Sequence, residues 1–209
     1  NDADKRSDLR ILYCMVLRAY SVKLASNYIE KNLYDASFRR MAIDLSIANG
    51  EYQEAKRLAK EGLVQDKGNE KNTLMWTETM YNIGTHTHDI KAMKTYAKKM
   101  LLMGDFDYYV KYKKMYSEEQ WQKALSELII ALKTNQKHRE TYLQVIIEEN
   151  IQDELVAFCK KNPDKIANYY PYVKAEHYKD IESYLENYYE KLMLSSVGKD
   201  EIRFQKIAL

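Results

Sequence analysis

Apolar side chains recur every three or four positions along most of the chain, which is the spacing of one face of an α-helix. Short polar breaks of two to five residues separate these stretches, so we predict successive antiparallel helical hairpins. The apolar stretches lie at residues 9–20, 24–29, 38–47, 52–63, 74–83, 90–101, 108–116, 121–132, 142–147, 155–159, 166–170 and 178–192. After a break at Val197-Gly198, residues 202–209 are expected to start another helix.

Turn and cap residues mark the ends of several predicted helices. Asn49-Gly50 can end a helix, because both residue types tolerate the left-handed backbone conformation that follows a helix. Ser117 and Gln120 have the spacing of a capping box, in which the hydroxyl accepts a backbone N–H and the amide side chain reaches back. Asn162-Pro163 ends another helix, since the residue before a proline avoids helical geometry.

Two segments of the chain resemble each other at an offset of 38 residues. They are NGEYQEAKRLAKEGL at residues 49–63 and THDIKAMKTYAKKML at residues 87–101, and their superposition pairs Ala59 with Ala97. Self-similarity at such a period is typical of stacked helical hairpins. We therefore predict an all-α fold, an α-solenoid, in which these two alanines and Ala55 are buried at close helix crossings.

The composition favours helices over strands. The 209 residues include only 6 glycines and 2 prolines, whereas all-β folds need turn residues about every ten positions. The 19 tyrosines suit the rims of helix interfaces, because a tyrosine ring packs while its hydroxyl reaches water. We expect one helical-repeat domain over residues 1–209, which could divide near residues 104–117.

Charge and cysteine content narrow the class of protein. The net charge is +2, from 33 Lys and Arg against 31 Asp and Glu, so no overall charge draws the chain toward nucleic acid or an anionic membrane. Cys14 and Cys159 stand in apolar segments, which predicts two buried free thiols and a cytoplasmic location. No signal peptide or apolar run of about 20 residues is visible. Because the chain begins at Asn1, we expect a fragment of a longer protein.

The segment Gly50-Glu51-Tyr52, followed by Ala55 and Ala59, resembles the turn and second helix of a tetratricopeptide repeat. The resemblance implies that the glycine makes the turn, that the tyrosine fills the base of the hairpin and that the alanines allow close helix approach. The first helix departs from that family, which has a large aromatic residue and a glycine where this chain has Arg39 and Ile43. The period of 38 residues is also longer than that family's unit, so the repeats are degenerate.

A narrower resemblance covers roughly residues 40–190 and is carried by four segments in order. These are NGEYQEAKRLAKEGL, KKMLLMGDFDYYVKYKKMY, EEQWQKALSELI and TYLQVIIEENIQDELVAFCKKNP. They are similar to the helical-repeat C-terminal region of bacterial SWIM zinc-finger proteins. The resemblance implies that the zinc-binding module, with the family's nucleic-acid or protein-binding association, lies upstream of Asn1.

The candidate chemistry within the chain is sparse. His86, His88 and Asp89 could offer a metal two imidazoles and a carboxylate, but zinc needs three or four ligands and no cysteine lies nearby, so we expect a polar turn and no metal. His138 and His177 are isolated and expected to be exposed. Neither cysteine has a neighbouring histidine and no glycine-rich phosphate loop occurs, so we expect neither an enzyme nor a cofactor.

Lysines and tyrosines alternate between residues 108 and 116, a mixture that can stack on bases and contact phosphates. The lysines surround the helix, however, and Asp105 and Asp107 precede them, so a solvated helix with a buried tyrosine stripe is the favoured interpretation.

Two functions follow as hypotheses. The first is a non-catalytic scaffold that binds a protein or peptide, and the alternative is a nucleic-acid-associated module acting with an upstream zinc finger. In tetratricopeptide-like stacks the first helices of the hairpins line the concave face. The resemblance therefore places the partner against four residues: Arg40, Asp44, Glu78 and Asn82.

Overall fold

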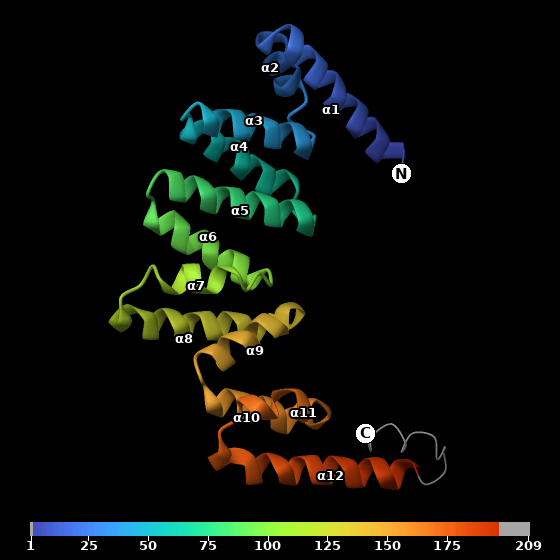
Figure 1. Cartoon of the computed structure of the whole chain (residues 1–209), viewed down its shortest axis with the longest axis vertical. Helices are drawn as coiled ribbons and strands as arrows, with labels where there is room; N and C mark the ends of the chain where they lie inside the picture. Colours follow the sequence, from blue (N-terminus) through green and yellow to red (C-terminus); the bar gives the residue numbers. More distant parts are fainter. Residues whose placement is uncertain (1, 197–209) are drawn as a thin grey trace. The chain divides into compact units, whose positions relative to one another are not determined.

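The computed structural model describes residues 2–196, with the side chains of residues 8–135 and 137–193. Every regular element in this part of the chain is helical, which confirms the predicted all-α class (Figure 1). The helix expected at residues 202–209 lies outside the described residues. The chain divides into two compact units, residues 1–138 and 139–209. The boundary considered near residues 104–117 therefore lies inside the first unit.

The first unit is a series of helices that pack in chain order. Neighbouring helices contact each other from α1 to α7, and α6 also contacts α8. The helices are α1 (Asp2–Tyr20), α2 (Val22–Lys31), α3 (Ala36–Ala48), α4 (Tyr52–Gln65), α5 (Glu70–His86), α6 (Ile90–Leu102), α7 (Tyr108–Lys113) and α8 (Glu118–Thr134), followed by the 3-10 turn η1 (Gln136–His138).

The second unit packs its remaining helices around α10, which contacts α9, α11 and α12. Leu155 and Cys159 of α10 are both fully buried. The elements are α9 (Arg139–Glu148), α10 (Gln152–Lys161), η2 (Pro163–Lys165), α11 (Ile166–Tyr169), η3 (Tyr170–Tyr172), η4 (Ala175–His177) and α12 (Tyr178–Ser196).

Four helices in the described part of the chain end in the same left-handed turn. In each turn one residue has a positive φ, and the N–H of the next residue donates to the carbonyl five positions earlier, at 2.7 to 3.0 Å. This pairing satisfies carbonyls that a helix end would otherwise leave without partners. The four residues are Gly50 (φ +76°), His88 (φ +53°), Gly104 (φ +95°) and Asn150 (φ +55°). The turn predicted at Asn49-Gly50 is thereby confirmed.

The offset of 38 residues reappears in the structure. Helix α4 begins at Tyr52 and α6 begins at Ile90, and the left-handed turns before them differ by the same offset. The side chains of Ala55, Ala59 and Ala97 are fully buried, as predicted. The two matching segments are therefore equivalent in their turns and helix starts, and Ala59 and Ala97 are buried alike.

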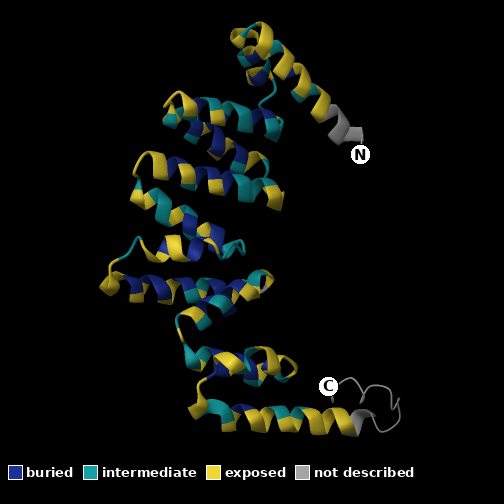
Figure 2. Ribbon diagram, in the orientation of Figure 1, coloured by how far each residue is buried: buried dark blue, intermediate teal, exposed yellow. Residues whose placement is uncertain are grey.

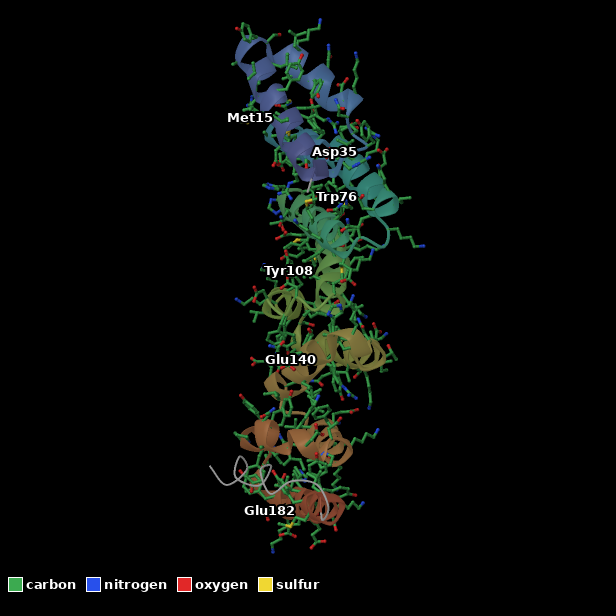
Figure 3. The ribbon with its side chains drawn as sticks, turned by 90° about the vertical axis from the view of Figure 1, so that its right-hand side faces the viewer. Met15, Asp35, Trp76, Tyr108, Glu140 and Glu182 are labelled. Atoms are coloured by element: carbon green, nitrogen blue, oxygen red, sulfur yellow. The ribbon has the colours of Figure 1, made fainter. Side chains whose placement is uncertain are left out.

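Trp76 is the largest side chain in the core that joins α3, α4 and α5 (Figure 3). Gly62 of α4 faces it, and a Cβ atom added there would lie 2.7 Å from the indole ring. The indole N–H donates to Asp66 Oδ2 at 2.7 Å, so the ring is buried without leaving its polar atom unpaired. The periodicity of the sequence did not place Trp76 at the centre of this core.

Helix α1 exposes the apolar face that the sequence periodicity suggested would be buried. Leu9, Leu12 and Val16 are 65%, 57% and 48% exposed, whereas Cys14 is 4% exposed. Figure 2 shows the exposed residues along α1. The helix carries apolar residues on both sides, so its periodicity alone could not select the buried side. The small core beneath α1 contains Cys14, Ala25, Ile29 and Phe38.

Arg39, which departs from the tetratricopeptide pattern, is buried in α3. Its guanidinium donates to the Leu58 carbonyl at 3.3 Å, to Glu61 Oε2 at 3.1 Å and to Gln65 Oε1 at 2.5 Å. These three partners lie on α4, so a buried charge links the two helices where the resemblance implies an aromatic residue. Ile43, in place of a glycine, is fully buried.

Replacing Ala59 with leucine should destabilise the first unit. The side chain is fully buried, and extra methylenes in a packed core cost about 1–3 kcal/mol. Urea unfolding would show a lower midpoint for Ala59→Leu than for Ala48→Leu, which makes the same change at an exposed position of α3. Equal midpoints for the two variants would contradict close packing at Ala59.

Replacing Gly62 with alanine should also destabilise the protein, although alanine favours a helix by about 1 kcal/mol over glycine. The new methyl group would lie 2.7 Å from the rigid indole ring of Trp76. Gly84→Ala is the control, because its methyl would meet looser contacts, 3.1 Å from the Met93 side chain and 3.3 Å from the Met93 backbone nitrogen. We expect Gly62→Ala to lower the melting temperature more than Gly84→Ala does, and a higher melting temperature than that of the wild type would refute the tight contact.

Candidate interaction surface

The four residues predicted to meet a partner lie on two helices and form what we term the α3–α5 face, defined as Arg40, Asp44, Glu78 and Asn82. On α3, Arg40 Nε donates to Asp44 Oδ1 at 3.0 Å and Oδ2 at 3.3 Å. Their side chains are 42% and 57% exposed. Glu78 and Asn82 of α5 are exposed as well. Among the described residues, no hydrogen bond or ion pair joins the two helices' members of this face.

Glu78 connects the α3–α5 face to α7. Its carboxylate accepts a hydrogen bond of 3.4 Å from the Tyr108 hydroxyl, and the Tyr108 ring meets Tyr81 edge to face with centroids 5.0 Å apart. Lys111 Nζ lies 4.1 Å from the centroid of Tyr108, within the range of a cation–π interaction. Burial, with a smaller effect of the charges of Glu78 and Asp105, raises the pKa of Tyr108.

The other tyrosines of α7 are also used in packing. Tyr109 and Tyr112 are 1% and 2% exposed, and Tyr108 is 3% exposed. Tyr112 meets Tyr116 and Trp121 at centroid distances of 5.1 and 6.0 Å. Base stacking on a protein requires exposed ring faces, so these three buried rings offer no stacking platform. The prediction of a buried tyrosine stripe is therefore confirmed for α7.

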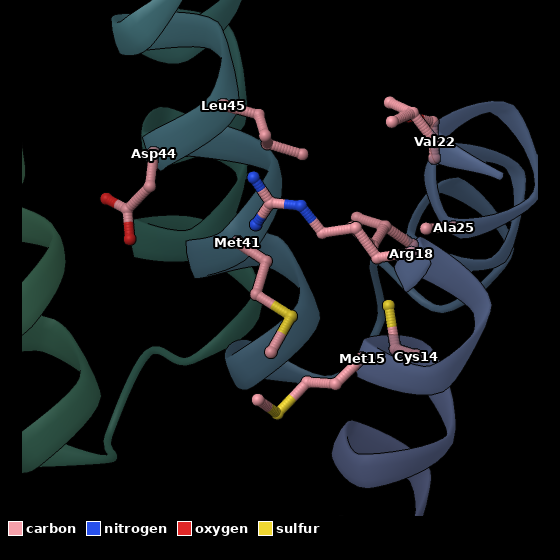
Figure 4. Close-up of a pocket in the computed structure, with 10 residues that line it drawn as sticks. Cys14, Met15, Arg18, Val22, Ala25, Met41, Asp44 and Leu45 are labelled. Carbon is pink, nitrogen blue, oxygen red and sulfur yellow. The ribbon is translucent and has the colours of Figure 1, made fainter. Parts of the chain in front are cut away.

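An apolar pocket lies between α1, α2 and α3 (Figure 4). Its volume is about 380 Å³, within the range of ligand pockets of roughly 300–1,000 Å³. We call it the α1–α3 pocket. Its lining consists of Cys14, Met15, Arg18, Val22, Ala25, Ser26, Ile29, Met41, Asp44 and Leu45.

Asp44 is the only member of the α3–α5 face in this lining. The pocket's thiol, Cys14, is buried and free, and its burial raises its pKa, which disfavours the reactive thiolate. Cys159 in the second unit is likewise buried and free, as predicted. Sequence patterns did not reveal the pocket, because it depends on how the consecutive helices α1, α2 and α3 pack against one another, which periodicity does not encode.

The two histidines that the sequence suggested as metal ligands, His86 and His88, take part in ring stacking and in a turn. His86 stacks on Tyr52 with ring centroids 5.7 Å apart, and His88 occupies the left-handed turn. Asp89 accepts the Ala92 N–H at 3.0 Å, which lowers the carboxyl pKa, and lies 3.7 Å from Lys56 Nζ. The described residues contain no group of three His, Cys, Asp or Glu side chains that could hold a metal ion.

The two isolated histidines are not fully exposed, contrary to expectation. His138 and His177 are half-buried. The His138 ring packs against Gly104, where an added Cβ atom would lie 2.5 Å from Nδ1. His177 lies 3.6 Å from the Glu176 carboxylate. The sequence lacked a signal for the His138 contact, because it depends on the absent side chain of a glycine 34 positions earlier.

No family model, curated protein or solved structure matches this chain. Within the described residues, none of the helices has both the length and the apolar character needed to cross a membrane.

Replacing Tyr108 with phenylalanine should reduce the loss of stability in alkali. The raised pKa keeps the Tyr108 phenol protonated in the folded protein, whereas the unfolded chain releases that proton near pH 10. The contribution of the protonated Tyr108 phenol to the stability of the fold is therefore fully present below about pH 10, and it is lost as the pH rises toward the pKa in the folded protein. Urea midpoints measured across this range should fall less steeply for Tyr108→Phe than for the wild type.

The control for that measurement is Tyr20→Phe, because Tyr20 is 85% exposed. Its urea midpoints should follow those of the wild type at every pH. A Tyr108→Phe profile that is parallel to the wild-type profile would show that this hydroxyl does not contribute to the alkaline transition.

Proposed function

We propose that this chain is a non-catalytic helical-repeat scaffold that binds a protein or peptide. In this proposal the helices of the first unit act as degenerate tetratricopeptide-like hairpins, and the partner lies against the α3–α5 face. The observation that carries the proposal is the α1–α3 pocket, because Asp44 belongs both to its lining and to that face. A concave apolar site beside exposed polar groups is a common arrangement for recognition.

Exposed apolar side chains on α1 and α2 support a macromolecular partner. Tyr20, Val22 and Leu24 are 85%, 67% and 51% exposed, and they continue the exposed apolar residues of α1. Large apolar side chains exposed at several nearby positions of the chain suit a contact with another protein better than a single exposed residue does. A peptide or protein could cover such surface, whereas a small polar metabolite could not.

The charges of the α3–α5 face favour a polypeptide over a nucleic-acid backbone. Arg40 is already paired with Asp44, and Glu78 adds a negative charge beside Asn82 on α5. A surface that binds phosphates concentrates uncompensated lysines and arginines. The alternative, a nucleic-acid module acting with an upstream zinc finger, therefore finds less support on this face.

Changing Arg40 and Asn82 together to alanine should reduce capture of the partner. Both side chains lie on the proposed contact surface, and truncating interface residues weakens binding where they contribute energy. The immobilised wild-type chain and this double variant would be compared by quantitative mass spectrometry of the proteins that each retains. Lys60→Ala with Gln53→Ala is the control, because it removes one positive charge and one amide from exposed positions of α4.

A protein that the wild type and the control retain equally, and the double variant loses, would support the proposal. Equal retention by all three chains would place the binding surface elsewhere. Recovery of nucleic acid alone, with an affinity that falls steeply as salt rises, would favour the nucleic-acid module.

A further inference from the structure

We propose that the α1–α3 pocket binds a helical peptide segment that inserts two apolar side chains and places a carboxylate beside Arg18. This inference rests on the proposed function and specifies the chemistry of the partner. The ligand would be an amphipathic helix with apolar anchors three or four residues apart and an acidic residue within one turn of them.

The size and lining of the pocket determine the apolar part of the ligand. A cavity of about 150 Å³ holds a benzene molecule, so the 380 Å³ of this pocket can take two side chains of leucine or phenylalanine size. Met15 and Met41 stand on α1 and α3, and methionine side chains adapt to irregular ligands. Apart from Arg18, Ser26 and Asp44, every residue of the lining is apolar.

The charges around the pocket determine the polar part of the ligand. Asp44 is neutralised by Arg40, whose Nε lies 3.0 Å from its carboxylate. Arg18 is exposed, and among the described residues its guanidinium has no hydrogen-bond or ion-pair partner. Figure 4 shows the Arg18 side chain extending from α1 toward Met41 and Leu45 of α3. A ligand anion would complete this site, and arginine binds carboxylates with two parallel hydrogen bonds.

The rim of the pocket favours a peptide over a free amphipathic anion such as a fatty acid. Met15 and Val22 belong to the lining, yet they are 62% and 67% exposed. The opening is therefore apolar and wide, and the backbone and flanking side chains of a helix can cover it. A single alkyl chain would leave most of these two residues in water.

Selection from a library of random peptides displayed on phage tests the proposal with the whole chain as the target. We expect the selected peptides to share two large apolar residues at a spacing of three or four, with Asp or Glu nearby. A fluorescent copy of the strongest binder then serves as the probe in anisotropy titrations, at an ionic strength of about 0.15 M.

Three variants of the chain distinguish the contribution of Arg18 to peptide binding from that of the apolar pocket. Arg18→Glu should lower the affinity for the probe by about tenfold or more. Replacing the probe's acidic residue with lysine should restore its binding to this variant. Ser26→Trp should abolish binding by filling the pocket from α2. Lys23→Glu, the same charge reversal at an exposed position of α2 outside the lining, should leave the affinity within about twofold. Circular dichroism of each variant establishes that it is folded.

Several results would overturn the proposal. Selected peptides whose affinity is unchanged in Arg18→Glu and Ser26→Trp would show that the pocket does not bind them, and selected peptides without an acidic residue would refute the carboxylate contact with Arg18. Dodecanoate that binds in an Arg18-dependent manner, while no selected peptide does, would assign the pocket to a free anion. Peptides that Ser26→Trp still binds, but Arg40→Ala with Asn82→Ala does not, would refute this inference and leave the proposed scaffold function supported.

Discussion

The reversal of the chain within three residues is the constraint on which the packing of the first unit depends. Only residues 49–51 separate α3 from α4, and residues 87–89 separate α5 from α6. In each turn a residue with positive φ reverses the direction of the chain, and the N–H of the next residue donates to a carbonyl at the helix end. Helices joined so closely must approach each other, which favours small buried residues such as Ala55 and Ala59.

The sequence predicted features that arise within one hairpin and missed those that arise between hairpins. Gly50 and the buried alanines were predictable, because turn chemistry and residue size act over a few positions. The burial of Trp76 was not, since it depends on the missing Cβ atom of Gly62 in the preceding helix. The position of helix α1 was predicted correctly, but the face predicted to be buried is exposed. Both faces of this helix carry apolar residues, so periodicity alone could not identify the buried one.

The same distinction applies to the candidate surface. Arg40 and Asp44 could be chosen from their place in the hairpin, and their spacing of four residues permits the ion pair that the structure contains. The role of Glu78 toward Tyr108 required the packing of α7 beside α5, which no local pattern encodes. His88 is a residue whose local position could have been predicted from the repeat but was not. Its residue type suggested metal chemistry, whereas its equivalence to Gly50 reveals a turn position, and histidine is among the residues that adopt this conformation more readily.

The offset of 38 residues also allows the pocket lining to be compared with the residues at equivalent positions. Phe38 and Trp76 are equivalent by this offset, and both are fully buried, so the centres of the two helix groups α1–α3 and α3–α5 are filled alike. Met41 and Leu45 correspond to Thr79 and Ile83, which are 4% and 2% exposed, whereas Met41 and Leu45 are only half-buried. Thr79 and Ile83 are therefore covered in the α3–α5 group, whereas Met41 and Leu45 stay half-buried and line the α1–α3 pocket. An apolar ligand in the proposed site would bury Met41 and Leu45 to the extent that Thr79 and Ile83 are already buried, and this comparison is a physical argument for the proposal.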